Sequence, residues 1–235
     1  MNKKVLKKIW SENAISFMSV EHTSQKNILH PIIANYVNSN SFKKILDYGC
    51  GDGRLLKMLE DYLFIDVYDI NNEMLELTKI NVNERINNYF SEVEKIKFNF
   101  YDCIILSMVL VCIDNKKEFK NILLNIKNFK KSKGKALIAV THPAFRDRKF
   151  SNFYTSYSEH QVFKYLNDGE PFNVHIQDKM PPSVSFVDYH WTLSFTLNQI
   201  IEAGLQIEKI IETQDDPNCK FMNDNYSPYI IIIAS

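Results

Sequence analysis

The sequence is poor in glycine, with only six residues in a chain of 235. Three of the six lie within residues 47–53, which read Asp-Tyr-Gly-Cys-Gly-Asp-Gly. Glycine is favoured where the backbone needs a positive φ angle or must pass close to a ligand. This short window is therefore the first candidate for a ligand site.

Cysteine is also scarce, and none of the four residues forms a CxxC pair. Closely spaced cysteines would predict a zinc site, and a disulfide framework would call for a short secreted chain. Neither pattern is present, so we expect free thiols in a reducing compartment, no metal and no disulfide. The four positions are Cys50, Cys103, Cys112 and Cys219.

The chain has no excess of charge, with 28 basic and 28 acidic side chains. A protein that grips long nucleic acid usually carries a basic surplus, so this partner is not expected. The basic start lacks the apolar stretch of a signal peptide, and the apolar run 103–113 is too short to cross a bilayer. We therefore expect a cytoplasmic protein without a membrane partner, organised as one domain over residues 1–235.

Predicted strands alternate with predicted helices along most of the chain. This order is typical of an α/β fold, in which a parallel sheet has helices on both faces. The run 230–233 consists of four isoleucines and should form an interior strand, because an exposed apolar edge invites aggregation. Strands are expected at 43–48, 64–68, 88–90, 101–106, 135–140, 205–211 and 229–234. Helices are expected at 3–18, from about Pro31 to Val37, and at 54–62, 71–82, 116–131 (ended by Gly134) and 196–203 (ended by Gly204).

The alternation breaks between residues 142 and 191, a stretch too long for an ordinary loop. Residues 145–195 hold twelve of the thirty aromatic side chains, and residues 142–190 hold four of the six histidines. A solvated linker would not concentrate aromatic residues in this way. We interpret the segment as a cap over the carboxyl ends of the strands, where open α/β sheets bind ligands.

The glycines at 47–53 have the spacing GxGxG between a predicted strand and a predicted helix, an arrangement suited to a nucleotide-like ligand. A dinucleotide fingerprint would place glycine or alanine at position 54, where Arg54 stands instead. Asp69 ends the next strand, 20 positions after Gly49, and a carboxylate there can accept hydrogen bonds from both ribose hydroxyls. Alternatively, Asp69 is only an acid at a helix start, and the window is only a tight turn.

With residues 67–70 (Val-Tyr-Asp-Ile), 101–107 and 133–138, this window resembles the motifs of class I S-adenosylmethionine-dependent methyltransferases. The resemblance implies a Rossmann-like three-layer sandwich, whose seven-stranded, mostly parallel sheet has an antiparallel last strand. It implies N-terminal helices over 1–40, a core of 41–141 and 192–235, and a cap insertion at 142–191. It further implies that S-adenosyl-L-methionine is the cofactor. The cofactor-binding residues that it suggests are Asp47, Gly49, Cys50, Gly51, Asp69, Ile70, Glu92 and Ser107.

Candidate proton acceptors lie in the cap. His142 directly follows the fifth strand, and His190 belongs to an Asp-Tyr-His-Trp sequence in which a carboxylate could orient the imidazole. Each histidine has a structural alternative, such as capping backbone groups. Aromatic side chains could wall an acceptor pocket or could form the cap's own core. The predicted pocket residues are Phe145, Tyr154, Tyr157, Tyr189 and Trp191.

The leading hypothesis is methyl transfer to oxygen or nitrogen of a small molecule by a monomer or homodimer. Methylation of tRNA or protein is an alternative that only the basic residues 3–8 support. A catalytically silent, cofactor-binding partner subunit is a second alternative. A nicotinamide oxidoreductase is the weakest, because of Arg54 and the glycine spacing.

Overall fold

The structure is a computed structural model that describes residues 20–158, 162–177, 184–216 and 226–235. Its main feature is a seven-stranded sheet in the order β3-β2-β1-β4-β5-β10-β9. All neighbouring pairs are parallel except those of β10, which runs antiparallel to both β5 and β9. The strands are β1 (Lys44–Tyr48), β2 (Phe64–Tyr68), β3 (Asn88–Phe90), β4 (Tyr101–Ser107), β5 (Lys130–Thr141), β9 (Ile207–Glu212) and β10 (Tyr229–Ala234). The predicted α/β fold with an antiparallel last strand is therefore confirmed.

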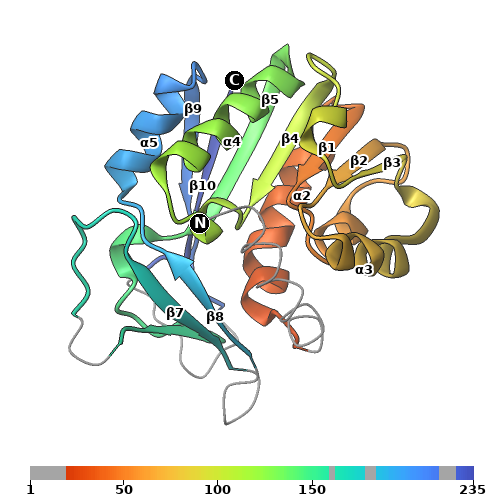
Figure 1. Cartoon of the computed structure of the whole chain (residues 1–235). Helices are drawn as coiled ribbons and strands as arrows, with labels where there is room; N and C mark the ends of the chain where they lie inside the picture. Colours follow the sequence, from red (N-terminus) through yellow and green to blue (C-terminus); the bar gives the residue numbers. More distant parts are fainter. Residues whose placement is uncertain (1–19, 159–161, 178–183, 217–225) are drawn as a thin grey trace.

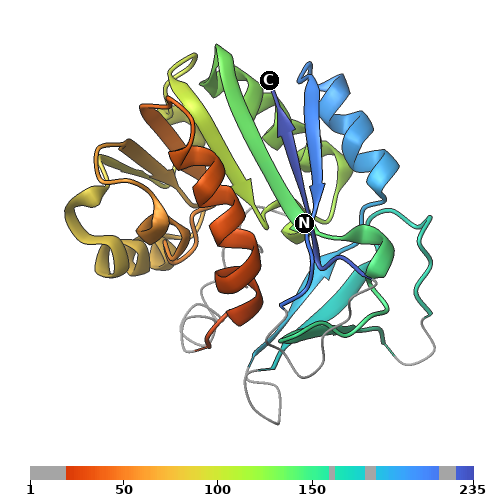
Figure 2. The same ribbon diagram turned by 180° about the vertical axis from the view of Figure 1, so that it is seen from behind.

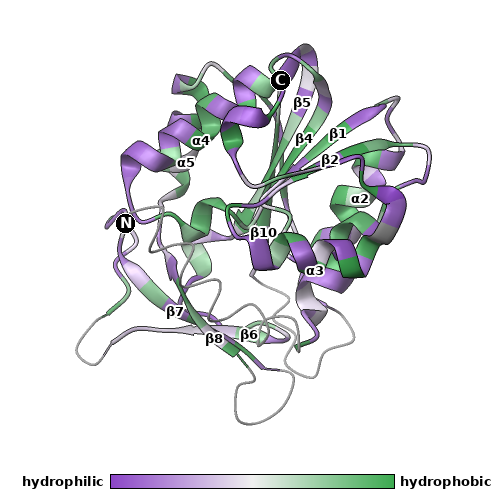
Figure 3. Ribbon diagram, turned by 45° about the vertical axis from the view of Figure 1, so that its right-hand side comes forward, coloured by the Kyte–Doolittle hydropathy of each residue, from purple (hydrophilic) through white to green (hydrophobic). Residues whose placement is uncertain are grey.

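Helices cover both faces of this sheet and make a three-layer sandwich (Figures 1 and 2). One buried cluster joins α4 and α5 to the sheet, and a second joins α2 and α3 to the opposite face. In Figure 3 the helices carry hydrophilic residues on their outer sides. The helices are η1 (Gln25–Leu29), α2 (His30–Asn38), α3 (Asn72–Val82), α4 (Lys116–Phe129) and α5 (Leu193–Glu202), with short 3-10 turns η2 (Leu55–Met58), η3 (Asn83–Arg85), η4 (Val93–Lys95), η5 (Leu110–Cys112) and η6 (Pro143–Phe145).

The helix predicted at 54–62 was wrong in extent, because only the short turn η2 forms there. Side chains from elsewhere take the backbone groups that a longer helix would use. Asn38 donates to the Met58 carbonyl at 2.9 Å, and its Oδ1 accepts from the Glu60 amide at 3.1 Å. Arg85 donates to the Leu56 carbonyl at 3.0 Å.

The predicted end of the helix at 116–131, placed at Gly134, was also wrong. Helix α4 ends at Phe129, and β5 begins at the next residue without a connecting loop. Gly134 instead lies inside β5, where a Cβ atom would come within 2.8 Å of the Tyr101 carbonyl oxygen on the neighbouring strand. Glycine at this position is therefore explained by the close approach of two backbones. The predicted helix at 3–18 and Cys219 lie outside the described residues.

The segment between β5 and α5 contains a second sheet, with the antiparallel order β6-β7-β8. Its strands are β6 (Phe153–Ser156), β7 (Pro171–Ile176) and β8 (Val184–Tyr189). Figures 1 and 2 show this small sheet beyond the carboxyl ends of the parallel strands. It therefore lies where a ligand of an open α/β sheet would bind.

The chain before α2 holds the small sheet against the main one. The amide of Ser24 donates to Oδ1 of Asn152 at 3.2 Å, and the Tyr229 hydroxyl donates to Oγ of Ser24 at 2.9 Å. Ser24, Asn152 and Tyr229 are buried. The N-terminal part of the described chain, the cap and the start of β10 thus meet at one point. No helix among the described residues combines the length and apolar character that a membrane crossing requires.

Candidate functional site

The glycine window forms a tight turn directly after β1. Gly49, Gly51 and Gly53 all have positive φ angles, of 85°, 56° and 76°. The amide of Gly49 donates to the carbonyl of Tyr68 at 2.7 Å, which ties the turn to the end of β2. A Cβ atom on Gly49 would lie 2.3 Å from Cγ2 of Val109, whereas one on Gly51 would meet nothing within 4 Å. Gly49 is therefore needed for packing, while Gly51 leaves open space beside its backbone.

Two carboxylates lie next to this turn. Asp47, on β1, pairs with Val67 of β2 and Ile105 of β4 in the centre of the sheet and is buried. Asp69 follows β2 and accepts from the amide of Gly51 at 3.0 Å and from the amide of Asn71 at 2.9 Å. These two bonds hold one oxygen each, so both oxygens keep a lone pair for a ligand.

Both carboxyl groups have raised pKa values. Burial, followed by the neighbouring Asp69 charge, raises the pKa of Asp47 to about 7. Burial raises the pKa of Asp69 to about 6, against the opposing effect of the hydrogen bonds from Asn71 and Gly51. Burial makes both acids difficult to ionise, and a nearby cation would stabilise their charged forms. The turn therefore favours a ligand that brings positive charge and hydroxyl donors.

A cavity of about 200 Å³ opens from the turn and extends to the cap. Among the described residues, its lining includes most of the cofactor-binding residues predicted from the sequence. They are Asp47, Gly49, Cys50, Gly51, Asp69, Ile70 and Ser107. Glu92 lies apart from this lining, exposed at the start of η4, where it pairs with Lys95 at 2.7 Å. The geometry gives Glu92 the role of a solvated acid at a helix end.

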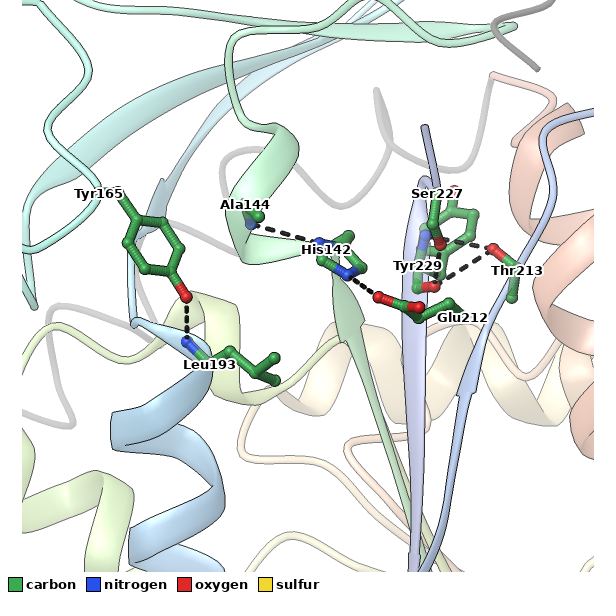
Figure 4. Close-up of polar contacts among 8 residues, drawn as sticks. All are labelled: His142, Ala144, Tyr165, Leu193, Glu212, Thr213, Ser227 and Tyr229. Carbon is green, nitrogen blue, oxygen red and sulfur yellow. Dashed lines mark hydrogen bonds and ion pairs between the residues drawn. The ribbon is translucent and has the colours of Figure 1, made fainter. Parts of the chain in front are cut away.

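His142, the predicted proton acceptor, is outside the lining of this cavity as drawn from the described residues. Its Nδ1 accepts from the amide of Ala144 at 3.2 Å, which requires the proton on Nε2. Nε2 lies 2.8 Å from Oε1 of Glu212 on β9 and donates to it (Figure 4). Burial lowers the pKa of His142 despite the opposing effect of Glu212. Both ring nitrogens thus form hydrogen bonds, and the His142 side chain links the end of β5 to β9.

His190 and Trp191 also lie away from the lining, within packed structure. Nε2 of His190 donates to the Tyr165 carbonyl at 2.7 Å, and the residue is 1% exposed. The Trp191 indole donates to the Ile113 carbonyl at 3.0 Å and packs against Phe119 with ring centroids 5.2 Å apart. Burial of these side chains against α4 and the cap loop gives both residues a packing role at this point of the fold.

The other predicted pocket residues form contacts within the cap. Phe145 stacks on His142 at 4.5 Å, and Tyr154 stacks on His175 at 4.7 Å. Tyr157 packs against Phe163 and Phe172, and Tyr189 ends β8. The lining drawn from the described residues includes neither these four nor His142, His190 and Trp191. Aromatic content located the cap, but the aromatic side chains themselves mostly pack against one another.

Sequence reasoning missed the residues that line the cap side of the cavity. They are His22, Gln25 and His30 from the N-terminal part, and Phe186 and Asp188 from β8. No sequence signal marked the last two, because in β8 the charged Asp188 is buried while the apolar Val187 is exposed. Burial of His30 lowers its pKa to about 4, so the ring is neutral at physiological pH. Among the described residues no cluster of side chains suits a metal ion.

The residues at the turn fit the cofactor that the sequence implied. S-adenosylmethionine carries a sulfonium, an α-ammonium group and two ribose hydroxyls. Asp47 and the open backbone at Gly51 suit the charged methionine end, and the lone pairs left on Asp69 suit the ribose. Ile70, which also lines the cavity, offers an apolar surface for a base.

Comparisons with known proteins bear on the family and the fold of the chain. A family profile described as a methyltransferase domain matches residues 21–177. A methyltransferase structure from Clostridium acetobutylicum shares 14% identity and a TM-score of 0.61, covering 99% of this chain and 98% of the other. One from Mesorhizobium loti shares 17% identity and a TM-score of 0.58, covering 84% and 92%.

A third similar structure is the 1,6-didemethyltoxoflavin-N1-methyltransferase of Burkholderia thailandensis, solved with 1,6-didemethyltoxoflavin and S-adenosylhomocysteine. It shares 14% identity and a TM-score of 0.62, covering 98% of this chain and 87% of the other. A search of curated protein sequences found no match. The family profile covers well over half of the chain. The strand order and the glycine turn are those that the resemblance to this family implied. The chain therefore belongs to the class I S-adenosylmethionine-dependent methyltransferases.

Proposed function

We propose that this enzyme transfers the methyl group of S-adenosylmethionine to an oxygen or nitrogen atom of a small molecule. The observation that carries the proposal is the continuation of the cavity from the glycine turn to the cap. There it is bounded by Phe186 and Asp188 of β8 and by His22 and Gln25 before α2. A cavity walled by a cap suits a metabolite better than a long polymer.

The chemistry asks mainly for alignment and for a site poor in water. S-adenosylmethionine supplies a methyl group that the sulfonium has already activated. Asp47, Asp69 and the glycine turn would fix its position, and the cap would hold the acceptor atom in line while excluding water. An acceptor that loses a proton also needs a group to receive it.

The similar protein from Burkholderia thailandensis is named as the N1-methyltransferase of 1,6-didemethyltoxoflavin and was solved with that molecule bound. At 14% identity this likeness supports the fold that surrounds such a site. For the present chain, the support for a small acceptor comes from the cavity itself and from the net charge of zero.

The test supplies S-adenosylmethionine labelled on its methyl group together with the metabolite, RNA and protein fractions of a cell lysate. We expect label to enter the low-mass fraction. Label confined to RNA or protein would contradict the proposal while leaving methyltransferase activity intact. The control is Asp69→Ala, which should weaken binding of S-adenosylhomocysteine by about tenfold in calorimetry, because hydrogen bonds to a charged group are lost. The same variant should reduce label transfer at low cofactor concentration.

A further inference from the structure

Asp188 occupies an unusual position at the end of β8. Asp188 is 1% exposed, yet it lines both the main cavity and a smaller neighbouring cavity of about 20 Å³. The residues shared by the two cavities are His22, Gln25, Met108, Phe186 and Asp188. Asp188 therefore lies where the space beside the cofactor turn meets the space under the cap.

The carboxyl group of Asp188 is only partly satisfied within the protein. Its Oδ1 lies 3.8 Å from Sγ of Cys112, a weak donor. Its Oδ2 is buried and has no hydrogen-bond partner in the described part of the chain. Buried polar atoms are nearly always paired, so an unpaired carboxylate oxygen beside a cavity points to a ligand that supplies the donor.

The charges around Asp188 leave it able to take a proton. Burial raises the pKa of Asp188 to about 7, against the opposing effect of the Arg146 charge. Arg146 is itself buried and lies over the Phe172 ring at 4.5 Å from its centroid, outside the cavity lining. A carboxyl group with a pKa near neutral is suited to accept a proton at physiological pH.

Asp188 is also close to the cofactor turn. The Cys112 thiol, which faces the same cavity, has its pKa raised by burial and then by the charges of both Asp188 and Asp69. The charges of both carboxylates, one in the cap and one after β2, therefore act on the same thiol. The two acids border the same cavity.

The remaining charges of the lining disfavour an anionic acceptor. Besides Asp188, the described lining includes Asp47, Asp69 and Glu118. Its one arginine, Arg54, is already engaged, because its Nε pairs with Asp52 at 2.7 Å and its Nη1 donates to the Val20 carbonyl at 2.8 Å. Among the described lining residues, a carboxylate or phosphate on the acceptor would meet several acids and no lysine or unengaged arginine.

We propose that Asp188 receives the proton of the methyl acceptor, and that the acceptor is therefore a neutral or cationic molecule with an N–H or O–H group. The proposal rests on the proposed function. The acceptor atom attacks the methyl carbon with its lone pair, the carbon–sulfur bond breaks, and the electron pair of that bond stays on sulfur. The proton leaves the acceptor nitrogen or oxygen and goes to the carboxylate of Asp188, which releases it to solvent with the products.

The experiment measures probe binding to protein saturated with S-adenosylhomocysteine, so that Asp47 and Asp69 are already covered. Benzamidine is the probe for a cation with N–H donors, and benzoate is the anion of matched size. In calorimetry the wild type should bind benzamidine and should show no saturable binding of benzoate. The Asp188→Asn substitution should weaken the binding of benzamidine by about tenfold. The control Asp147→Asn removes an acid in the same cap whose side chain is 52% exposed and should change neither probe.

Benzoate binding the wild type as tightly as benzamidine would overturn the proposal, and this result needs no variant. Unchanged benzamidine affinity in Asp188→Asn would overturn it as well, provided that the variant still binds S-adenosylhomocysteine. Failure of the small-molecule hypothesis would be seen separately, as methyl label that enters only RNA or protein while the probe results stand.

Discussion

Replacing Asp47 by asparagine removes a carboxyl group that burial has made difficult to ionise. The rise in its pKa from 3.8 to about 7 amounts to roughly 4 kcal/mol of preference for the neutral form. The unfolded chain has no such preference. The free energy of unfolding therefore depends on pH, and the direction of this dependence follows from the raised value.

A raised carboxyl pKa means that the folded protein binds the proton more tightly than the unfolded chain does. The resulting stabilisation is complete below the unfolded pKa and is lost as the pH rises through about 7. Between about pH 6 and pH 8 the free energy of unfolding should fall by about 1.4 kcal/mol on account of Asp47 alone. The amide side chain of the Asp47→Asn variant cannot titrate, so this part of the slope should disappear.

The assay is urea unfolding of the ligand-free protein at both pH values, for the wild type and for Asp47→Asn. Asp69 and Asp188 also have raised pKa values, and they titrate in both proteins. Because the Asp69 charge contributes to the raised pKa of Asp47, the difference between the two slopes reports Asp47 together with its interaction with Asp69. Identical slopes would refute the reasoning. In the wild type, binding of S-adenosylhomocysteine should strengthen by up to about tenfold over the same pH rise, because its ammonium group favours the ionised carboxylate.

Three further substitutions test other parts of the site. His142→Ala should lower the melting temperature by about 3 °C in a thermal scan and leave cofactor affinity unchanged; a normal melting temperature with abolished turnover would restore its catalytic role. Gly49→Ala should weaken cofactor binding by about tenfold in calorimetry, because its Cβ would lie 2.3 Å from Cγ2 of Val109; full affinity would show that the turn adapts. Trp191→Phe should cost about 1 kcal/mol in urea unfolding, since the indole bond to the Ile113 carbonyl is lost; unchanged stability would contradict a packing role.

The sequence predicted best where local pattern and structure depend on the same residues. The apolar run of β10, Tyr229–Ala234, was located at its observed bounds because an interior strand is apolar on both faces. The turn at residues 47–53 was located because backbone positions with positive φ angles favour glycine, and three glycines stand close together there. Both features are encoded by consecutive residues, so they need no knowledge of distant contacts.

The cap could not be predicted in the same detail, because its contacts join residues far apart in the chain. The roles of His142 and Trp191 are decided by Glu212 and by the Ile113 carbonyl, which lie 70 and 78 positions away. The local sequence around a histidine at a strand end does not show whether its side chain takes part in catalysis or links two strands by a hydrogen bond. The cavity-facing side of β8 could not be predicted either, because the charged Asp188 is buried there through the pairing of β8 with β7.

The π-helical turn η1, Gln25–Leu29, runs directly into the α-helix at His30. Such a turn holds one residue more than regular α-helical winding would use. Deleting one residue within it would rewind the helix and rotate everything before it by about 100° relative to α2. His22 and Gln25 would then leave the cavity wall, while Asp47 and the glycine turn would keep their places. A single inserted residue therefore lets this helix face the acceptor space without altering how the helix packs on the sheet.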